Sequence, residues 1–116
     1  MSDTRAKLRL CSVDDVARDS VIRVEAGDLA LAVFNVCGVF YVTDDQCTHG
    51  PGSLSDGYLD GFEIECDFHN GKFDIRTGEV LAPPCMLPLR TYKVFIENND
   101  VLVESIEEPR STTTAS

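Results

Sequence analysis

Cys47-Thr48-His49-Gly50 and Cys66-Asp67-Phe68-His69-Asn70-Gly71 are the two stretches around which this chain is organised. They read as C-x-H and C-x-x-H, they are separated by the sixteen residues 50–65, and they contain both histidines of the protein. Each stretch offers one thiolate and one imidazole, which are good ligands for transition metals, next to a glycine that permits a tight turn. The pattern predicts a metal site built from two short loops, with the ligands Cys47, His49, Cys66 and His69.

Two kinds of metal centre could use these four side chains. Zinc accepts two Cys and two His, but its common arrangements place the two cysteines together and the two histidines together. Here each loop carries one of each, which suits a two-iron cluster with both thiolates on one iron and both imidazoles on the other, the Rieske 2Fe–2S centre. A structural zinc site is the alternative.

With these motifs the sequence resembles the Rieske-type ferredoxins, and in particular the small ferredoxin components of bacterial aromatic-ring-hydroxylating dioxygenases. The resemblance covers residues from about 7 to 104. It implies one Rieske-type 2Fe–2S cluster and an all-β Rieske fold of antiparallel sheets, with a small cluster-binding subdomain inserted in a larger β base. We expect a single domain over residues 1–106, the subdomain at about 45–85, and a disordered tail at 107–116, which is acidic and then rich in Ser and Thr.

The resemblance implies electron transfer rather than catalysis. A ferredoxin of this kind takes electrons singly from a flavin-dependent, NADH-oxidising reductase and passes them to a terminal oxygenase, and it meets both partners transiently. The chain is not itself expected to be an oxygenase component, because a catalytic mononuclear iron typically needs two further histidines and a carboxylate. The alternative function is a non-catalytic subunit of a larger complex, either Rieske-like or zinc-binding.

Four positions near the ligands predict a reduction potential at the low end of the Rieske range, roughly −150 mV. High-potential Rieske proteins resemble this motif but add a Cys to each loop, and the two form a disulfide; Gly52 and Phe68 stand at the matching positions. Those proteins also carry a Ser and a Tyr whose hydroxyls hydrogen-bond to sulfur, where this chain has Gly71 and Phe73. Fewer donors to sulfur stabilise the reduced form less.

A third loop is predicted at Ala82-Pro83-Pro84-Cys85. Proline donates no ladder hydrogen bond, so the Pro83-Pro84 pair ends a strand. In Rieske proteins a proline-bearing segment at this place packs over the cluster, and the resemblance implies the same shielding role for Pro83-Pro84.

The rest of the chain reads as short strands. Alternating, β-branched and aromatic runs predict strands at 7–11, 21–25, 29–36, 39–43, 62–66, 72–75, 87–97 and 101–105. Ser12 followed by Asp14 and Asp15 predicts no more than a short helical turn. We therefore expect the N-terminal strands to form an antiparallel meander.

The charge of the chain limits its partners. The net charge is −10, and residues 44–79 contribute −7 of it, from nine acids and two cations. Such a balance argues against nucleic acid, whose phosphates attract Lys and Arg. It favours docking onto basic patches of protein partners, where charge raises the encounter rate, although an acidic surface that only aids solubility is the alternative.

The cysteine count and the chain start indicate the compartment. Cys11, Cys37 and Cys85 are odd in number and scattered, and we expect them to be small buried hydrophobes or inert thiols. The chain begins with polar residues and has no long apolar run, so neither a signal peptide nor a membrane span is expected. Together these features predict a protein of the reducing cytoplasm.

Overall fold

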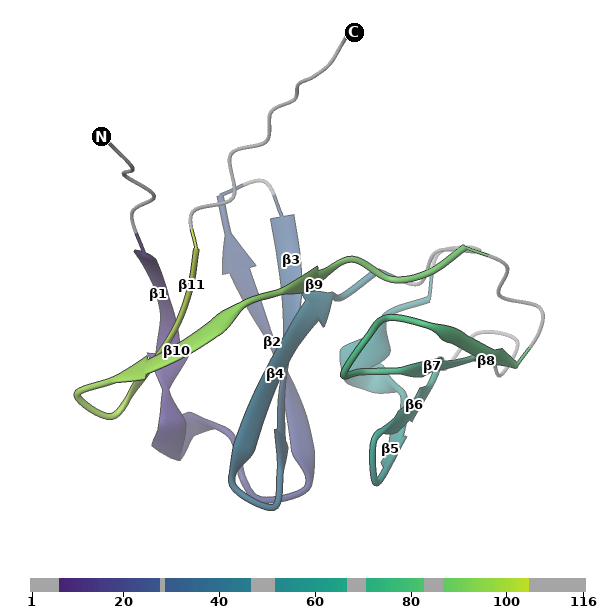
Figure 1. Cartoon of the computed structure of the whole chain (residues 1–116), viewed down its shortest axis with the longest axis horizontal. Coiled ribbons are helices and arrows are strands. Elements are labelled where there is room, and N and C mark those ends of the chain that lie inside the picture. Colours follow the sequence, from purple (N-terminus) through teal and green to yellow (C-terminus); the bar gives the residue numbers. More distant parts are fainter. Residues whose placement is uncertain (1–6, 28, 47–51, 67–70, 83–86, 105–116) are drawn as a thin grey trace, which may run out of the picture.

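The described part of the chain is made of antiparallel strands and two short 3₁₀ turns (Figure 1). The computed structural model describes residues 7–27, 29–46, 52–66, 71–82 and 87–104. In chain order the elements are β1 (Lys7–Ser12), η1 (Val13–Asp15), β2 (Ser20–Ala26), β3 (Leu29–Val36), β4 (Val39–Asp44), η2 (Leu54–Asp56), β5 (Tyr58–Asp60), β6 (Glu63–Glu65), β7 (Lys72–Asp74), β8 (Val80–Ala82), β9 (Thr91–Tyr92), β10 (Val94–Glu97) and β11 (Asp100–Glu104).

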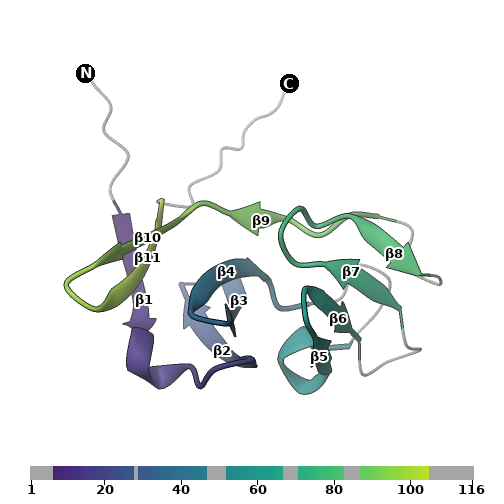
Figure 2. The ribbon, with the colours of Figure 1, turned by 60° about the horizontal axis from the view of Figure 1, so that its bottom comes forward.

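The strands form three sheets, with the orders β1-β11-β10, β2-β3-β4-β9 and β5-β6-β7-β8, here called the first, second and third sheet. In two views the third sheet lies at one end of the molecule and the first at the other, with the second between them (Figures 1 and 2). All paired strands run antiparallel. The expected all-β class is confirmed.

Strand β3 is the centre of the fold because both of its faces are buried. Successive side chains point to opposite faces of a strand, so Leu31 and Val33 face one side while Ala32 and Phe34 face the other; all four are 0% exposed. A strand that is covered on both faces reads as a nearly continuous apolar run, as Leu29–Val36 does.

Each face of β3 contributes to its own hydrophobic core. The sandwich core lies between the first and second sheets and contains Leu10, Cys11, Val16, Leu31, Val33, Val42, Val101 and Val103. The distal core joins the other face of β3 to the third sheet and contains Ala32, Phe34, Val36, Leu54, Ile64, Cys66, Phe73, Ile75 and Leu89. The third sheet is therefore held against the rest of the molecule through β3.

The segment Thr91–Glu97 links the first two sheets. Its beginning, β9, pairs with β4 through Val42↔Tyr92, and its end, β10, pairs with β11 through Val94↔Val103. The chain changes sheets at Lys93, which is how corners of packed sheets are commonly made.

The predicted strands are largely confirmed, and the differences have physical reasons. β1 pairs with β11 rather than with the next strand, so the expected meander contains only β2, β3 and β4. The strand expected from residue 87 begins at Thr91, because Pro88 cannot donate and Leu89 N–H is bonded to the Gly78 carbonyl at 2.8 Å. The three-residue strands β5 and β8 were not predicted, since pairing with neighbours rather than local propensity forms them.

The short helical turn after Ser12 is confirmed. The Ser12 hydroxyl accepts from Asp14 N–H, and the Asp15 carboxylate accepts from Ser12 N–H, which makes a capping box for η1. No helix among the described residues is long and apolar enough to cross a membrane. The tail at 107–116 lies outside the described residues, and the expected domain limits stay predictions.

Candidate metal centre

Of the four predicted ligands, the structure describes Cys66. It directly follows β6 and is 1% exposed. Its backbone N–H donates to the Gly71 carbonyl at 2.7 Å, next to the ladder pair Glu65↔Lys72. The second predicted loop is thus closed at its base, between β6 and β7. Cys47, His49 and His69 lie outside the described residues.

The two ends of the first predicted loop are also joined. Gln46 and Ser53 form an isolated antiparallel bridge. Leu54 N–H donates to the Asp45 carbonyl at 2.7 Å, and Asp45 N–H donates to the Ala30 carbonyl, beside β3, at 3.0 Å. The chain therefore leaves the second sheet after β4 and returns to the same place before η2.

The bases of all three predicted loops meet in the distal core. Leu54 follows segment 47–51, Cys66 and Phe73 flank segment 67–70, and Leu89 follows segment 83–86. All four side chains belong to the distal core, under the Phe34 face of β3. A site whose ligands come from separate loops requires such a convergence, which the spacing of the motifs alone does not establish.

Two glycines allow close backbone approaches that hold these bases in place. A Cβ on Gly57 would lie 2.1 Å from the carbonyl oxygen of Glu65, so only glycine lets the end of η2 lie against the strand that leads to Cys66. A Cβ on Gly78, where φ is +81°, would lie 2.2 Å from the carbonyl oxygen of Leu89. This second contact joins the β7–β8 turn to the chain that precedes β9.

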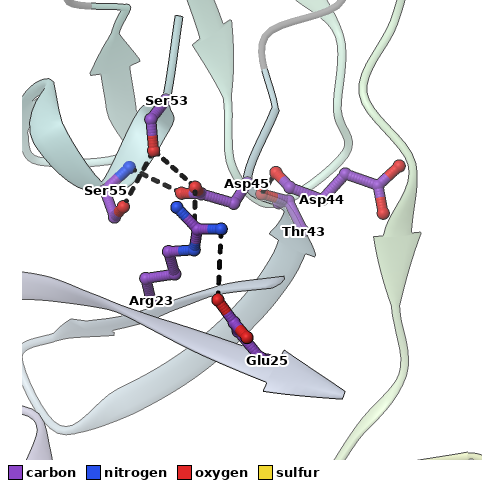
Figure 3. A network of polar contacts seen from close by, with 7 residues as sticks. All are labelled: Arg23, Glu25, Thr43, Asp44, Asp45, Ser53 and Ser55. Atoms are coloured by element: carbon purple, nitrogen blue, oxygen red, sulfur yellow. Dashed lines mark hydrogen bonds and ion pairs between the residues drawn. The ribbon is translucent and has the colours of Figure 1, made fainter. Parts of the chain in front are cut away.

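Asp45 is a buried polar residue of the site that the sequence did not single out. It is 2% exposed, and its carboxylate accepts from Ser53 Oγ and from Ser55 N–H, the latter at 2.8 Å (Figure 3). Asp45 is one of the nine acids in residues 44–79, but because it is buried it adds no charge to an exposed acidic surface. The sequence signal that could have identified Asp45 is the presence of two serines, Ser53 and Ser55, eight and ten residues later.

The described residues fit a metal centre held through sulfur. Thiolate is the soft ligand that iron–sulfur clusters require, and the Cys66 side chain lies in an apolar core from which water is excluded. Among the residues that the structure describes, no group of three or more His, Cys, Asp or Glu offers a different metal site. Pro83 and Pro84 lie outside those residues, so their shielding role stays a prediction.

The remaining cysteines differ from one another. Cys11 is 5% exposed in the sandwich core, and burial raises the pKa of its thiol. Cys37 is exposed in the β3–β4 turn, where φ is +54° and its N–H donates to Asp19 Oδ1 at 3.2 Å. The expectation was a buried hydrophobe or an inert thiol. Cys11 is confirmed as a buried hydrophobe, whereas Cys37 is exposed, so for Cys37 the inert thiol stays a prediction. Cys85 lies outside the described residues.

Comparisons with known proteins identify the class of domain. Residues 6–93 match the family model described as the Rieske [2Fe-2S] domain, and the chain belongs to this family. The ferredoxin component of the p-cumate 2,3-dioxygenase system of Pseudomonas putida is 50% identical over 97 residues, which cover 82% of each protein. The relatives are thus ferredoxin components of dioxygenase systems, as the resemblance implied.

Solved structures agree. The Sphingomonas yanoikuyae B1 ferredoxin superposes with a TM-score of 0.83 at 48% identity, over 86% of this chain and 99% of that one. A chain from the complex of reduced oxygenase and oxidized ferredoxin in carbazole 1,9a-dioxygenase gives a TM-score of 0.80 at 39% identity, over 90% of this chain and 100% of that one. The Rieske fold and the class of electron carrier rather than enzyme are confirmed.

Proposed function

We propose that this protein is a one-electron carrier with one Rieske [2Fe–2S] cluster, held by Cys47, His49, Cys66 and His69. The observation that carries the proposal is that residues at the bases of all three predicted loops pack together in the distal core. Cys66, which is buried there, lies at the hydrogen-bonded base of the second loop. When bound, such a cluster takes up and releases one electron at a time.

The residues around Cys66 would supply a rigid and dry support. Ile64 and Phe73 are paired across β6 and β7, and both are 0% exposed. Since these side chains fill the inner side of the third sheet, the thiolate of Cys66 would be presented from a position that water does not reach. Because the base of this loop is already closed by hydrogen bonds, less conformational entropy would be lost when the loop binds the cluster.

The electrons would come from a flavin-dependent NADH reductase and go to the terminal oxygenase of an aromatic-ring dioxygenase system. The relatives at 50% and 48% identity are ferredoxins, and one matched chain belongs to a solved complex of oxygenase and ferredoxin. A cytoplasmic location follows, because the reductase draws on NADH there. Transient contact with two partners in turn suits a carrier that delivers single electrons.

A reconstituted turnover assay tests this role. NADH, a flavin-dependent reductase and the terminal oxygenase of the p-cumate 2,3-dioxygenase system are combined with and without this protein. Product formation should require the protein, and a Cys66→Ser variant should support none. Product that forms equally fast without the protein would overturn the carrier role.

We also propose a low reduction potential, roughly −150 mV. Gly71 is buried at the base of the second loop and Phe73 is 0% exposed, and neither has a hydroxyl that could donate to sulfur. In a potentiometric titration, Gly71→Ser should raise the potential while Gly71→Ala, which makes the same backbone change without a hydroxyl, should not. A wild-type potential clearly above zero would contradict the argument.

The solvent face of the third sheet is the proposed docking surface for both partners. Asp60 and Glu63 lie directly opposite each other on β5 and β6. Two residues further along the same strands, Tyr58 lies opposite Glu65. Like charges in directly opposite positions destabilise a sheet, and among the described residues no cation forms an ion pair with these three acids. A basic surface on the partner would neutralise them close to Cys66.

The salt dependence of electron transfer tests the docking surface. Rates of transfer to the oxygenase should fall as salt rises from low to moderate, because screening weakens charge steering. Asp60→Asn and Glu63→Gln should lower the rate several-fold at low salt. Glu97→Gln makes the same charge change on β10, in the first sheet, and should leave the rate unchanged. Rates that stay flat with salt would count against this surface.

A further inference from the structure

Asp45 is a buried carboxylate at the point where the chain leaves β4 for the first loop. Its side chain is 3% exposed, and acids are almost never buried so fully unless their oxygens are bonded. One oxygen accepts from Ser53 Oγ and the other from the backbone N–H of Ser55 (Figure 3). Both donors lie on the far side of the loop, so one side chain joins its beginning to its end.

The backbone of Asp45 anchors the same point to the rest of the molecule. Its N–H donates to the Ala30 carbonyl at 3.0 Å, and its carbonyl accepts from Leu54 N–H at 2.7 Å. Leu54 in turn is 0% exposed in the distal core. Asp45 is therefore hydrogen-bonded to β3, to the end of the first loop and to the first residue of η2.

Among the residues that the structure describes, one cation lies near the Asp45 carboxylate, and it compensates the negative charge only weakly. Arg23 Nε lies 4.0 Å from its Oδ2, but the Arg23 side chain is 51% exposed and also lies 3.3 Å from Glu25. The two hydrogen bonds across the loop are thus its main stabilisation, and hydrogen bonds to an ionised acceptor are the stronger kind. The bonds enclose residues 46–52, which include Cys47 and His49.

We propose that Asp45, through Ser53 and Ser55, is a positioning residue that clamps the two ends of the first ligand loop and so presents Cys47 and His49 in the geometry that the cluster needs. This inference rests on the proposed function, because it takes both residues as ligands. Asp45 itself touches no ligand in this account. It acts by removing freedom from the loop, since ligands that are ordered before binding lose less entropy when they bind.

The test compares four variants for their hold on the cluster. Asp45→Asn removes the charge and one acceptor, and Ser53→Ala removes one donor. Ser55→Ala keeps the backbone N–H that Asp45 uses but removes the hydroxyl that lies 3.1 Å from Ser53 Oγ. Asp56→Asn makes the same charge change on an exposed residue of η2 and is the matched control. The readouts are the half-life of the visible absorbance under an iron chelator, the reduction potential and the electron paramagnetic resonance line shape.

The expected order follows the bonds that are lost. Asp45→Asn should shorten the half-life by about ten-fold, the effect of losing a hydrogen bond to a charged group, and Ser53→Ala by somewhat less. Ser55→Ala keeps both hydrogen bonds to Asp45 and loses only the contact with the Ser53 hydroxyl, so it should shorten the half-life less than Ser53→Ala does. Asp56→Asn should resemble the wild type. The cluster retained in Asp45→Asn should also show a broadened signal and a shifted potential, which a merely structural role would not produce.

Two results would overturn the inference. One is a half-life of Asp45→Asn equal to that of Asp56→Asn. The other is an unchanged signal and potential in Asp45→Asn while the metal-free protein loses stability, which would make Asp45 a residue of the general fold. If Asp45→Asn does not fold, Ser53→Ala decides by the same criteria. A wild type that binds no cluster would instead refute the proposed function, and the inference with it, before any variant is compared.

Discussion

The two sheets that enclose the sandwich core are built differently from the third sheet, although the core of each region includes one face of β3. Strands β2, β3 and β4 are seven, eight and six residues long, whereas β5, β6, β7 and β8 have three residues each. The sandwich core is filled by aliphatic side chains and Cys11, but the distal core includes Cys66, a proposed ligand.

The difference indicates that one part of the chain provides most of the stability, the sandwich core, and another carries the proposed metal ligand, the third sheet. Long paired strands with a closed apolar core hold together on their own, while strands of three residues depend on what they pack against. In the third sheet this support comes from the second face of β3 and, in our account, from the metal, whose binding energy adds to folding energy. The following predictions test this contrast, from the largest expected effect to the smallest.

Cys66→Ser should abolish cluster binding and loosen the third sheet alone. A serine hydroxyl is a poor ligand for iron, so iron and sulfide should be absent from the purified variant. In hydrogen exchange, amides of β6 and β7 should lose protection while those of β3 and β4 keep it. Cys37→Ser, a change at an exposed thiol in the β3–β4 turn, is the control and should retain the cluster. Protection lost equally in all sheets would contradict the contrast.

Leu31→Ala and Phe34→Ala probe the two faces of β3. Leu31→Ala opens the sandwich core and should lower the free energy of unfolding by about 2–5 kcal/mol in both the metal-free and the cluster-bound protein. Phe34→Ala should cost about 3–5 kcal/mol in the cluster-bound protein, and less in the metal-free one, if the cluster adds support to the third sheet as proposed. Denaturant titrations of both forms measure this. An equal cost of Phe34→Ala in the two forms would show that the distal core needs no metal.

Tyr92→Phe should weaken the edge of the second sheet. The Tyr92 hydroxyl donates to Asp44 Oδ1 at 2.5 Å, and loss of a hydrogen bond to a charged group should cost about 1.5–3 kcal/mol. Burial, and then the bond to Asp44, raises the pKa of Tyr92 above its ordinary value of 10.0. The folded state thus holds the phenol proton more tightly than the unfolded one, so this residue's contribution to stability is present below pH 10 and is lost as pH rises further.

The alkaline limb of the stability profile measures this contribution. Wild-type protein should lose stability above about pH 10, and Tyr92→Phe should lose less over the same range. Tyr58→Phe, at a side chain that is 67% exposed, should follow the wild type. Identical alkaline profiles for Tyr92→Phe and the wild type would rule out the linkage.

Asp74→Asn should have the smallest effect, confined to acid. The Arg76 side chain donates to both carboxylate oxygens of Asp74, at 3.1 and 2.9 Å, and this lowers the pKa of Asp74 from its ordinary value of 3.8. Its contribution to stability is therefore present above pH 3.8 and is lost as pH falls below that value. Thermal melts should decline less steeply in acid for Asp74→Asn than for the wild type or for Asp56→Asn. Equal slopes would exclude a role for the pair.

Arg76 also links the third sheet to the second. Its guanidinium lies 4.2 Å from the centre of the Phe62 ring, and that ring meets the edge of Tyr41 on β4 at 6.0 Å. Asp74 and Arg76 therefore lie between the third sheet and the second. When acid breaks their ion pair, we expect the packing between these two sheets to weaken before either sheet unfolds.

Local patterns of the sequence predicted what depends on local chemistry. The apolar run Leu29–Val36 was expected as a strand and is one, with the same limits. The ligand motifs pointed to the Rieske family, which the comparisons confirm. The pairing of β1 with β11 and the two cores of β3 were missed, because they depend on contacts between residues far apart in the chain.

Asp45 shows the same limit within the candidate site. In the sequence it looks like Asp44 beside it, which is half-buried, and only the hydrogen bonds from Ser53 and Ser55 make it a buried acceptor. The assignment of Cys47, His49 and His69 as ligands remains a prediction from spacing and resemblance.

Electron paramagnetic resonance on the dithionite-reduced protein, with iron and sulfide assayed on the same sample, tests the central claim most directly. Ligation of one iron by two thiolates and of the other by two imidazoles predicts a rhombic signal with an average g value below that of the free electron, and iron and sulfide near parity. A silent spectrum from a protein that holds stoichiometric zinc would contradict the claim and leave a structural metal domain.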